Sequence, residues 1–191
     1  MKYTDELPPG LRDFLTYHET IRGHSKKTVD EYFLDMRTFF RYIKLKRGHV
    51  PQDTPFESIP ITDVDLALIK SIELSDVYDY LLFLSRERVR RYNSPQSGTG
   101  LSAAARARKI ASIRSLYKYL TVKVSLLDKN PVQDLDAPKP KKTLPRFLTL
   151  EESLTLLENV DGPFRQRDYC ILTLFLNCGL RISELAGLNL F

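Results

Sequence analysis

Cysteine and histidine are scarce in this chain of 191 residues, and their shortage excludes several kinds of site. The two cysteines, Cys170 and Cys178, lie eight positions apart in one apolar segment. That spacing suits two buried core thiols better than a disulfide or a metal site. The three histidines are scattered and form no cluster of ligands, so we expect no bound metal.

Long apolar runs are also absent. No stretch approaches the roughly 18 apolar residues that identify a membrane-spanning helix. The first residues, Met-Lys-Tyr-Thr-Asp-Glu, lack the apolar run of a secretory signal, so we expect a cytoplasmic location and no membrane contact. The chain has no internal repeats or low-complexity tracts either, and its 42% of apolar residues suffices for a packed core.

The net charge of +5 conceals an uneven distribution along the chain. Residues 86–146 carry 15 Lys and Arg against 4 Asp and Glu, whereas residues 1–85 carry 11 against 14 and residues 147–191 carry 3 against 6. A basic segment of this kind is typical of proteins that bind nucleic acids. The alternative is a solvated basic face without a partner. We favour duplex DNA as the partner of this segment.

Hydrophobic periodicity predicts that the first part of the chain is all helical. Over residues 28–43 the apolar residues recur at intervals of three and four, and Ser25 or Thr28 is placed to cap the helix. Similar patterns predict helices over residues 8–22, 62–72, 75–88 and 102–121, and a last short helix starting at Asn130-Pro131. Residues 53–85 hold seven acids and one lysine, so we do not expect this part to face DNA.

Candidate phosphate-binding cations gather on the 102–121 helix and in the segment after the helical part. Residues 136–146 contain three prolines and four basic residues, which predicts an extended basic linker lying along a phosphate backbone. For any single side chain a solvated surface position is an equally good interpretation. The leading candidates for DNA contact are Arg106, Arg108, Lys109, Arg114 and Lys118 on the helix and Lys139, Lys141, Lys142 and Arg146 in the linker. Further candidates that would flank a groove are Lys26, Lys27, Arg37, Arg41 and Lys44 on the earlier helix.

A second domain is predicted to begin near Phe147. Thr149 and Glu152 have the spacing of a capping box before a leucine-rich stretch. The helix predicted over residues 165–177 is apolar on several sides, which implies burial on several faces. The rest of the chain offers too little surface to bury it, so we expect this domain to be incomplete.

A single arginine follows that helix in the segment Cys178-Gly179-Leu180-Arg181-Ile182-Ser183-Glu184-Leu185. An arginine just after a glycine turn, at the start of a short helix, can present its planar charged fork to a phosphate. The alternative is a surface or ion-paired arginine. Glu184 lies within helical reach of Arg181, and we expect it to hold the guanidinium or to cap the local backbone.

The chain resembles the N-terminal part of the tyrosine recombinase (phage-integrase) family, in its Xer-like branch. The segment from Leu176 to Leu185 matches the family's box around its first catalytic arginine. Residues 144–152 resemble the usual opening of the catalytic domain, and Asn130-Pro131 before a proline- and lysine-rich stretch resembles the usual domain join. Ser25, Thr28 and Tyr32, together with residues 113–120, resemble the helical core-binding domain.

The resemblance implies a fold and an activity. Residues 1–135 would form a helical, SAM-like core-binding domain that is all-α, residues 136–146 a basic linker, and residues 147–191 the truncated start of an α+β catalytic domain. Such proteins are site-specific recombinases that clamp duplex DNA and join to it through a 3′-phosphotyrosyl link, without metal or nucleotide cofactor. They act as homo- or hetero-tetramers of recombinase subunits in processes such as DNA integration and chromosome partition. Of their catalytic residues only the first arginine, Arg181, can be carried over, with Glu184 supporting it.

One departure from the family limits what the chain is expected to do. The lysine hairpin, the His-x-x-Arg box, the second His or Trp and the tyrosine nucleophile normally follow the point where this sequence stops. The ten tyrosines present lie mostly at core spacing and are not candidates for that nucleophile. We therefore expect this chain to bind DNA without cleaving it. The competing hypothesis is a non-catalytic helical DNA-binding protein, either a regulator or an architectural factor.

Overall fold

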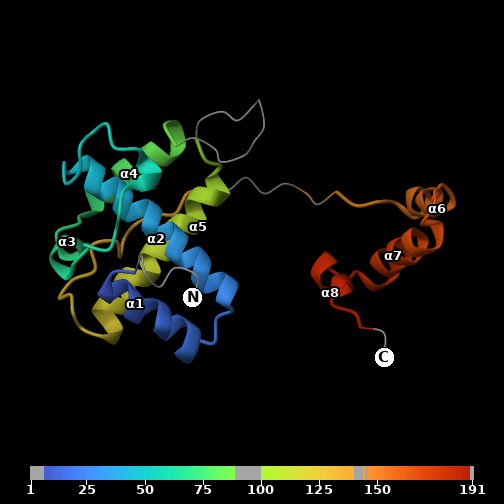
Figure 1. The fold of residues 1–191 in the computed structure, drawn as a ribbon, viewed down its shortest axis with the longest axis horizontal. Coiled ribbons are helices and arrows are strands. Elements are labelled where there is room, and N and C mark those ends of the chain that lie inside the picture. The colour runs from blue at the N-terminus through green and yellow to red at the C-terminus, as the bar shows by residue number, and fades with distance from the viewer. Residues whose placement is uncertain (1–6, 89–99, 140–143, 145, 190–191) are drawn as a thin grey trace. The chain divides into compact units, whose positions relative to one another are not determined.

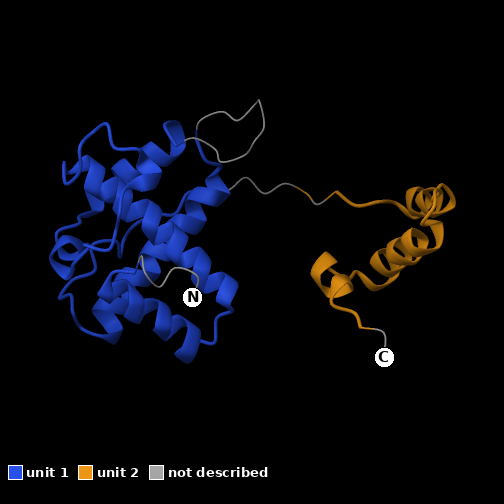
Figure 2. Cartoon of the chain, viewed as in Figure 1, with its two compact units in different colours: residues 1–141 blue, residues 142–191 orange. Residues whose placement is uncertain are grey.

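The computed structural model describes residues 7–88, 100–139, 144 and 146–189, and the regular secondary structure in these residues is helical (Figure 1). The all-α expectation is thereby confirmed for the described part of the chain. Contacts divide the chain into two compact units, unit 1 (residues 1–141) and unit 2 (residues 142–191), as Figure 2 shows. Among the described helices, none is both long and apolar enough to cross a membrane.

Unit 1 is built around the long helix α2 (Lys26–Lys46). Ser25 caps it, because its side-chain oxygen accepts the backbone N–H of Thr28 at 3.2 Å. The helices α1 (Pro9–Thr16), α4 (Leu74–Arg86) and α5 (Ala103–Lys118) pack against α2. Fully buried aromatic side chains fill the space between them: Phe14, Phe33, Phe39, Phe40, Tyr80 and Tyr117. Burying one large apolar side chain contributes about 1.5–3 kcal/mol, so this aromatic core dominates the cohesion of unit 1.

Shorter elements complete unit 1. The π-helical turns η2 (Tyr17–Ile21) and η4 (Tyr119–Lys123) continue α1 and α5, and the 3₁₀ turn η3 (Phe56–Ser58) precedes the short helix α3 (Leu66–Lys70). The predicted start of α3 at Thr62 or Asp63 is wrong. Asp65 is the cap, and its carboxylate accepts the backbone N–H of Leu68 at 2.8 Å.

The predicted helix at Asn130-Pro131 is also wrong. Residues 131–134 form turns instead of a helix. The Asn130 side chain accepts the backbone N–H of Val132 at 3.0 Å, which is an Asx turn that competes with helix formation. Val132 and Leu135 are buried, so this segment is held to the core of unit 1 by its apolar side chains.

Unit 2 consists of α6 (Leu150–Glu158), α7 (Arg165–Cys178) and α8 (Ile182–Ala186). The predicted capping box is confirmed, since Glu152 N–H donates to the Thr149 hydroxyl at 3.2 Å and Thr149 N–H donates to the Glu152 carboxylate at 2.7 Å. None of the residues described in unit 2 is buried.

The cysteines of α7 show the consequence of that exposure. Cys170 and Cys178 are both exposed, so the prediction of two buried thiols is wrong for this chain. The apolar pattern of α7 is real, but α7 packs against the short helix α6, which has too little apolar surface to cover it on several sides.

Candidate nucleic-acid interface

The basic helix α5 begins at a tightly constrained corner of unit 1. Gly100, just before it, has φ +86°, and a Cβ atom there would lie 2.2 Å from the carbonyl oxygen of Ser85. The backbone N–H of Leu101 donates to the carbonyl of Leu84, in α4, at 2.7 Å. Ser102 then caps α5 by accepting a backbone N–H bond of 3.2 Å. These contacts fix the first turn of α5 against the end of α4, which gives its side chains defined positions.

Five cations and no acid lie within α5. Arg114 and Lys118 are exposed, and neither takes part in an ion pair with the residues that the structure describes. Arg106 is partly buried, and its Nε has no hydrogen-bond partner among the same residues. Arg114 and Lys118, in the later turns of α5, therefore supply positive charge that no acid among the described residues neutralises.

The first turns of α5 are different, because two cations there pair with acids of α2. Asp35, whose side chain is fully buried, accepts hydrogen bonds from Lys109 Nζ at 2.9 Å, from the Ser112 hydroxyl at 2.8 Å and from Arg108 Nη1 at 3.0 Å. Arg108 Nη1 also donates to Glu31 at 2.7 Å. Burial lowers the pKa of Lys109, and Asp35 acts in the opposite direction. Arg108 and Lys109 thus hold α5 to α2 through Asp35.

Two of the cations expected to flank a groove are buried instead. Arg41 donates from Nε to the carbonyl of Ile59 at 2.8 Å, and its Nη1 donates to Glu57 at 2.9 Å. Lys44 donates to the carbonyl of Pro60 at 2.9 Å and pairs with Asp63. The expectation was wrong for both, because they hold the loop over residues 57–63 against α2. Lys26 and Lys27 are exposed, and Arg37 is partly buried.

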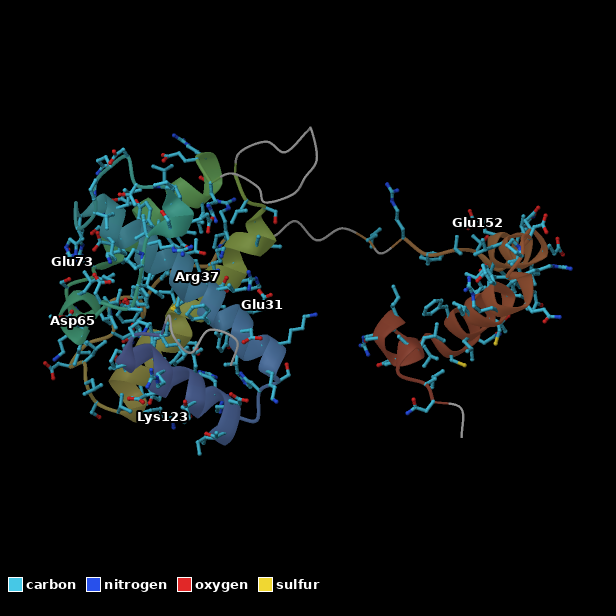
Figure 3. The ribbon with its side chains drawn as sticks, in the orientation of Figure 1. Glu31, Arg37, Asp65, Glu73, Lys123 and Glu152 are labelled. Carbon is cyan, nitrogen blue, oxygen red and sulfur yellow. The ribbon has the colours of Figure 1, made fainter. Side chains whose placement is uncertain are left out.

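A cavity of about 190 Å³ lies where α5 meets α2, and its lining includes Glu31, Asp35, Arg37, Arg108 and Lys109. Glu31 and Arg37 both project from α2 (Figure 3). Asp65 and Glu73, from the acid-rich stretch of residues 53–85, lie in Figure 3 at the other end of unit 1 from Glu31. Asp65 and Glu73 therefore lie away from Glu31, whereas Glu57, from the same stretch, lines the cavity together with Arg108 and Lys109.

The predicted linker is only partly described. Lys139 and Arg146 are exposed. Lys141 and Lys142 lie outside the described residues.

In unit 2, Arg181 sits at the start of α8 as the sequence suggested. Gly179, with φ +62°, ends α7 in the left-handed conformation that glycine adopts readily. The Arg181 backbone N–H donates to Glu184 Oε2 at 2.8 Å, and its Nη1 donates to Glu184 Oε1 at 3.0 Å. The Arg181 side chain is 82% exposed. A short ion pair therefore orients the guanidinium while leaving most of it accessible.

Comparisons with known proteins identify the family. No family model and no solved structure matches the chain. Tyrosine recombinase XerC of Caldanaerobacter subterraneus subsp. tengcongensis is 49% identical over 185 residues, which cover 97% of this chain and 49% of that protein. The chain belongs to the Xer-like tyrosine recombinases, as an N-terminal portion. Tyrosine recombinase XerC of Myxococcus xanthus is 35% identical over 96% of this chain and 51% of its own length.

A third relative extends the match to another named group. Tyrosine recombinase XerD of Mycobacterium tuberculosis is 29% identical over 187 residues, covering 94% of this chain and 52% of that protein. The chain spans about half the length of the curated relatives it matches. The family resemblance inferred from the Arg181 segment and the linker is thereby confirmed.

Sequence reasoning missed the acids that organise the start of α5. Asp35 lies within the apolar face of α2, between Phe33 and Met36, and a carboxylate in that position needs cationic or hydrogen-bonding partners. A carboxylate on the apolar face of a helix could therefore have indicated a buried ion pair. Sequence reasoning also missed a pair of neighbouring histidines, buried His18 and partly buried His24, for which their spacing gave no signal. His18 Nε2 lies 3.1 Å from the Ser115 hydroxyl, and its Nδ1 lies 3.3 Å from His24 Nδ1. Burial first, and then the positive charge of His24 and Arg22, lower the pKa of His18 to about 4.

Proposed function

We propose that this chain is the DNA-binding portion of a site-specific recombinase, one that cuts and rejoins duplex DNA through a 3′-phosphotyrosyl intermediate. The observation that carries the proposal is the 49% identity over 97% of the chain to a protein named tyrosine recombinase XerC. The segment around Arg181 adds a residue suited to the chemistry. In this proposal residues 1–135, the greater part of unit 1, are the core-binding domain, residues 136–146 are the linker, and residues 147–191 belong to the catalytic domain.

DNA binding in this proposal depends on the cations of α5 and the linker. Phosphate contacts supply affinity, and they make it strongly dependent on salt, because each contact releases counterions from the duplex. Arg114 and Lys118 suit this role, since they are exposed and are not neutralised by described acids. Lys139 and Arg146, with Lys141 and Lys142 between them in sequence, would follow the backbone as an extended strap.

Arg181 would act on the phosphate that reacts. A guanidinium can donate two parallel hydrogen bonds to a phosphate, and donors already in position stabilise the charge that grows in the transition state. Glu184 holds both the backbone and the side chain of Arg181, which restricts the guanidinium before any DNA arrives. Glu184 is therefore a positioning residue in this proposal. The proposed reaction needs no metal or nucleotide cofactor.

The proposed partners are duplex DNA and further recombinase subunits, as a homo- or hetero-tetramer on two DNA sites. The proposed location is the cytoplasm, where such a protein meets chromosomal DNA. Neither assignment depends on the identity of the target site.

The first test measures duplex binding by the 191-residue chain at several salt concentrations. We expect affinity to fall steeply as salt rises, and we expect Arg114→Gln to weaken binding to all sequences and to reduce the salt slope by about 1. A matched control is Arg167→Gln, which removes an exposed arginine of unit 2 that pairs with Asp168. Binding without salt dependence would contradict the proposal.

The second test addresses catalysis in a longer protein that carries this chain together with a tyrosine nucleophile. Arg181→Ala should abolish covalent trapping of a nicked duplex and leave duplex affinity nearly unchanged. Arg167→Ala should leave both unchanged. If wild-type protein binds DNA but forms no covalent adduct, the non-catalytic regulator becomes the better description. If Arg181→Ala still forms the adduct, the role given to Arg181 is wrong.

A further inference from the structure

The guanidinium of Arg108 is held in one orientation before DNA is bound. Its Nη1 donates to Asp35 Oδ2 at 3.0 Å and to Glu31 Oε2 at 2.7 Å, and its Nη2 lies 3.0 Å from Asp35 Oδ1. Asp35 is fully buried and is itself fixed by Lys109 and Ser112. An exposed arginine normally samples many rotamers, but this one is clamped from two sides.

The clamp leaves a defined part of the guanidinium unused. Both terminal nitrogens of Arg108 face Asp35, so the end of the fork is occupied. A guanidinium is planar and has five N–H donors in fixed directions. Its Nε has no partner in the described structure, and the side chain remains 48% exposed. The Nε–H and the outward N–H of Nη2 therefore form a free edge that can donate two parallel hydrogen bonds.

The charge around Arg108 selects the kind of acceptor. Arg108 and Lys109 bring two positive charges, and Asp35 and Glu31 bring two negative ones. Arg37, Arg88 and Glu57 also line the cavity, so acids offset most of the positive charge there. Glu31 is about half exposed beside the guanidinium and would repel an approaching phosphate. A base edge is uncharged, so it would not be repelled in this way. In the major groove, guanine presents two adjacent acceptors, O6 and N7, which match an arginine edge.

We propose that Arg108 reads a guanine in the major groove, with Glu31 and Asp35 as positioning residues that hold its free edge toward the base. This inference rests on the proposed DNA-binding function and names the chemistry that one residue of α5 recognises. Arg114 provides the contrast on the same helix, because it is exposed and lacks a carboxylate partner among described residues. Arg114 is suited to contact a phosphate, a role that any cation can fill, whereas Arg108 is suited to donate hydrogen bonds to a base.

The experiment selects duplexes from a library with a randomised central segment, using the 191-residue chain and its variants. Arg108→Lys keeps the charge and removes the fork, and Arg114→Lys is the matched control. We expect wild-type and Arg114→Lys proteins to select guanine strongly at a position where Arg108→Lys selects it much more weakly, because an ammonium can donate to O6 or N7 but lacks the planar fork that engages both. Affinity of Arg108→Lys for the selected duplex should fall by roughly 5- to 150-fold, while its affinity for unselected duplexes stays nearly constant. Circular dichroism melting of each variant checks that unit 1 remains folded.

Two further measurements separate the base from the phosphate backbone. Replacing the selected guanine by 7-deazaguanine, which lacks the N7 acceptor, should weaken wild-type binding more than it weakens Arg108→Lys binding. Glu31→Gln removes a charge that repels phosphates, so it should tighten binding to unselected duplexes. Because it also weakens the hold on Arg108, it should reduce the preference for the selected guanine.

The outcomes distinguish this inference from the proposed function. If Arg108→Lys loses the same affinity for every sequence, or if 7-deazaguanine is tolerated, guanine reading is wrong while DNA binding stands. The same conclusion follows if Arg108→Lys binds as wild type throughout. If the wild-type chain binds no duplex in a salt-dependent way, both the inference and the proposed function fail.

Discussion

The two units of this chain have similar sequence patterns and very different burial. In unit 1, apolar residues at helical spacing on α2, α4 and α5 meet one another and become fully buried. In unit 2, equally clear patterns on α6 and α7 leave every described residue at least partly exposed. Periodicity therefore predicts that a helix exists, but burial depends on whether neighbouring elements supply enough apolar surface. Stability should accordingly be concentrated in unit 1.

The largest expected difference comes from one substitution made in both units. Leu84→Ala in α4 removes a fully buried side chain and should lower the free energy of unfolding by about 2–5 kcal/mol, through lost burial and a residual cavity. Leu156→Ala in α6 removes a side chain that is 40% exposed, and the main unfolding transition should change by less than about 0.5 kcal/mol. Urea unfolding followed by circular dichroism measures both. Similar losses in the two variants would show that unit 2 shares the core on which unit 1 depends.

A slightly smaller effect is expected at the buried carboxylate of unit 1. Asp35→Ala leaves Lys109 without its partner in a mostly buried position, and should cost about 3 kcal/mol. Replacing both partners, as Asp35→Leu with Lys109→Met, should recover much of that loss because no unpaired charge remains. The exposed pair Arg167–Asp168 in unit 2 is the control, and Asp168→Ala should change the unfolding transition by less than about 1 kcal/mol. A double variant as unstable as Asp35→Ala alone would mean that the loss arises from packing and not from charge.

The electrostatics of unit 1 also predict that its stability depends on pH, and all three histidines of the chain lie in this unit. The pKa of His18 is about 4 in the fold, against about 6.5 for an unfolded chain. Between these values the unfolded chain binds a proton that the folded chain does not, so the free energy of unfolding should fall as pH drops from about 6.5 to 4. Unfolding of wild type and His18→Gln at several pH values tests this, with the exposed His49→Gln as control. The variant His18→Gln should lose part of the pH dependence, and an unchanged profile would exclude His18 as its source.

Much of the helical framework could be predicted from sequence, because caps and periodicity are local. Ser25, Ser102 and the Thr149–Glu152 pair cap helices where their spacing indicated. The predictions failed where a side chain took a distant partner. Lys44 and Asp63 pair with each other across 19 positions, which removes Lys44 from the surface and Asp63 from the start of α3.

The same contrast between local and distant partners applies to the residues of the candidate site. Arg181 and Glu184 lie three positions apart, and their contact followed from helical spacing. Arg108 and Asp35 are 73 positions apart, so only the packing of α5 on α2 shows that a predicted DNA contact is also an internal ion pair. From the sequence, the cations of α5 were equal candidates for DNA contact because they gather on one helix. The fold distinguishes them, because Arg108 and Lys109 pair with Asp35 whereas Arg114 and Lys118 have no acidic partner among the described residues.

The smallest expected effect compares the helix caps of the two units. Ser102→Ala removes the side-chain acceptor at the start of α5 and should lower the stability of unit 1 by about 1 kcal/mol. Thr149→Ala removes the same kind of acceptor at the start of α6. Because α6 has no buried side chain to couple it to a core, the loss should appear as local fraying, with less helical signal and faster amide exchange in α6. The cooperative unfolding transition should not move. If Thr149→Ala shifts that transition as far as Ser102→Ala does, the two units unfold together, and the contrast in burial does not translate into a contrast in stability.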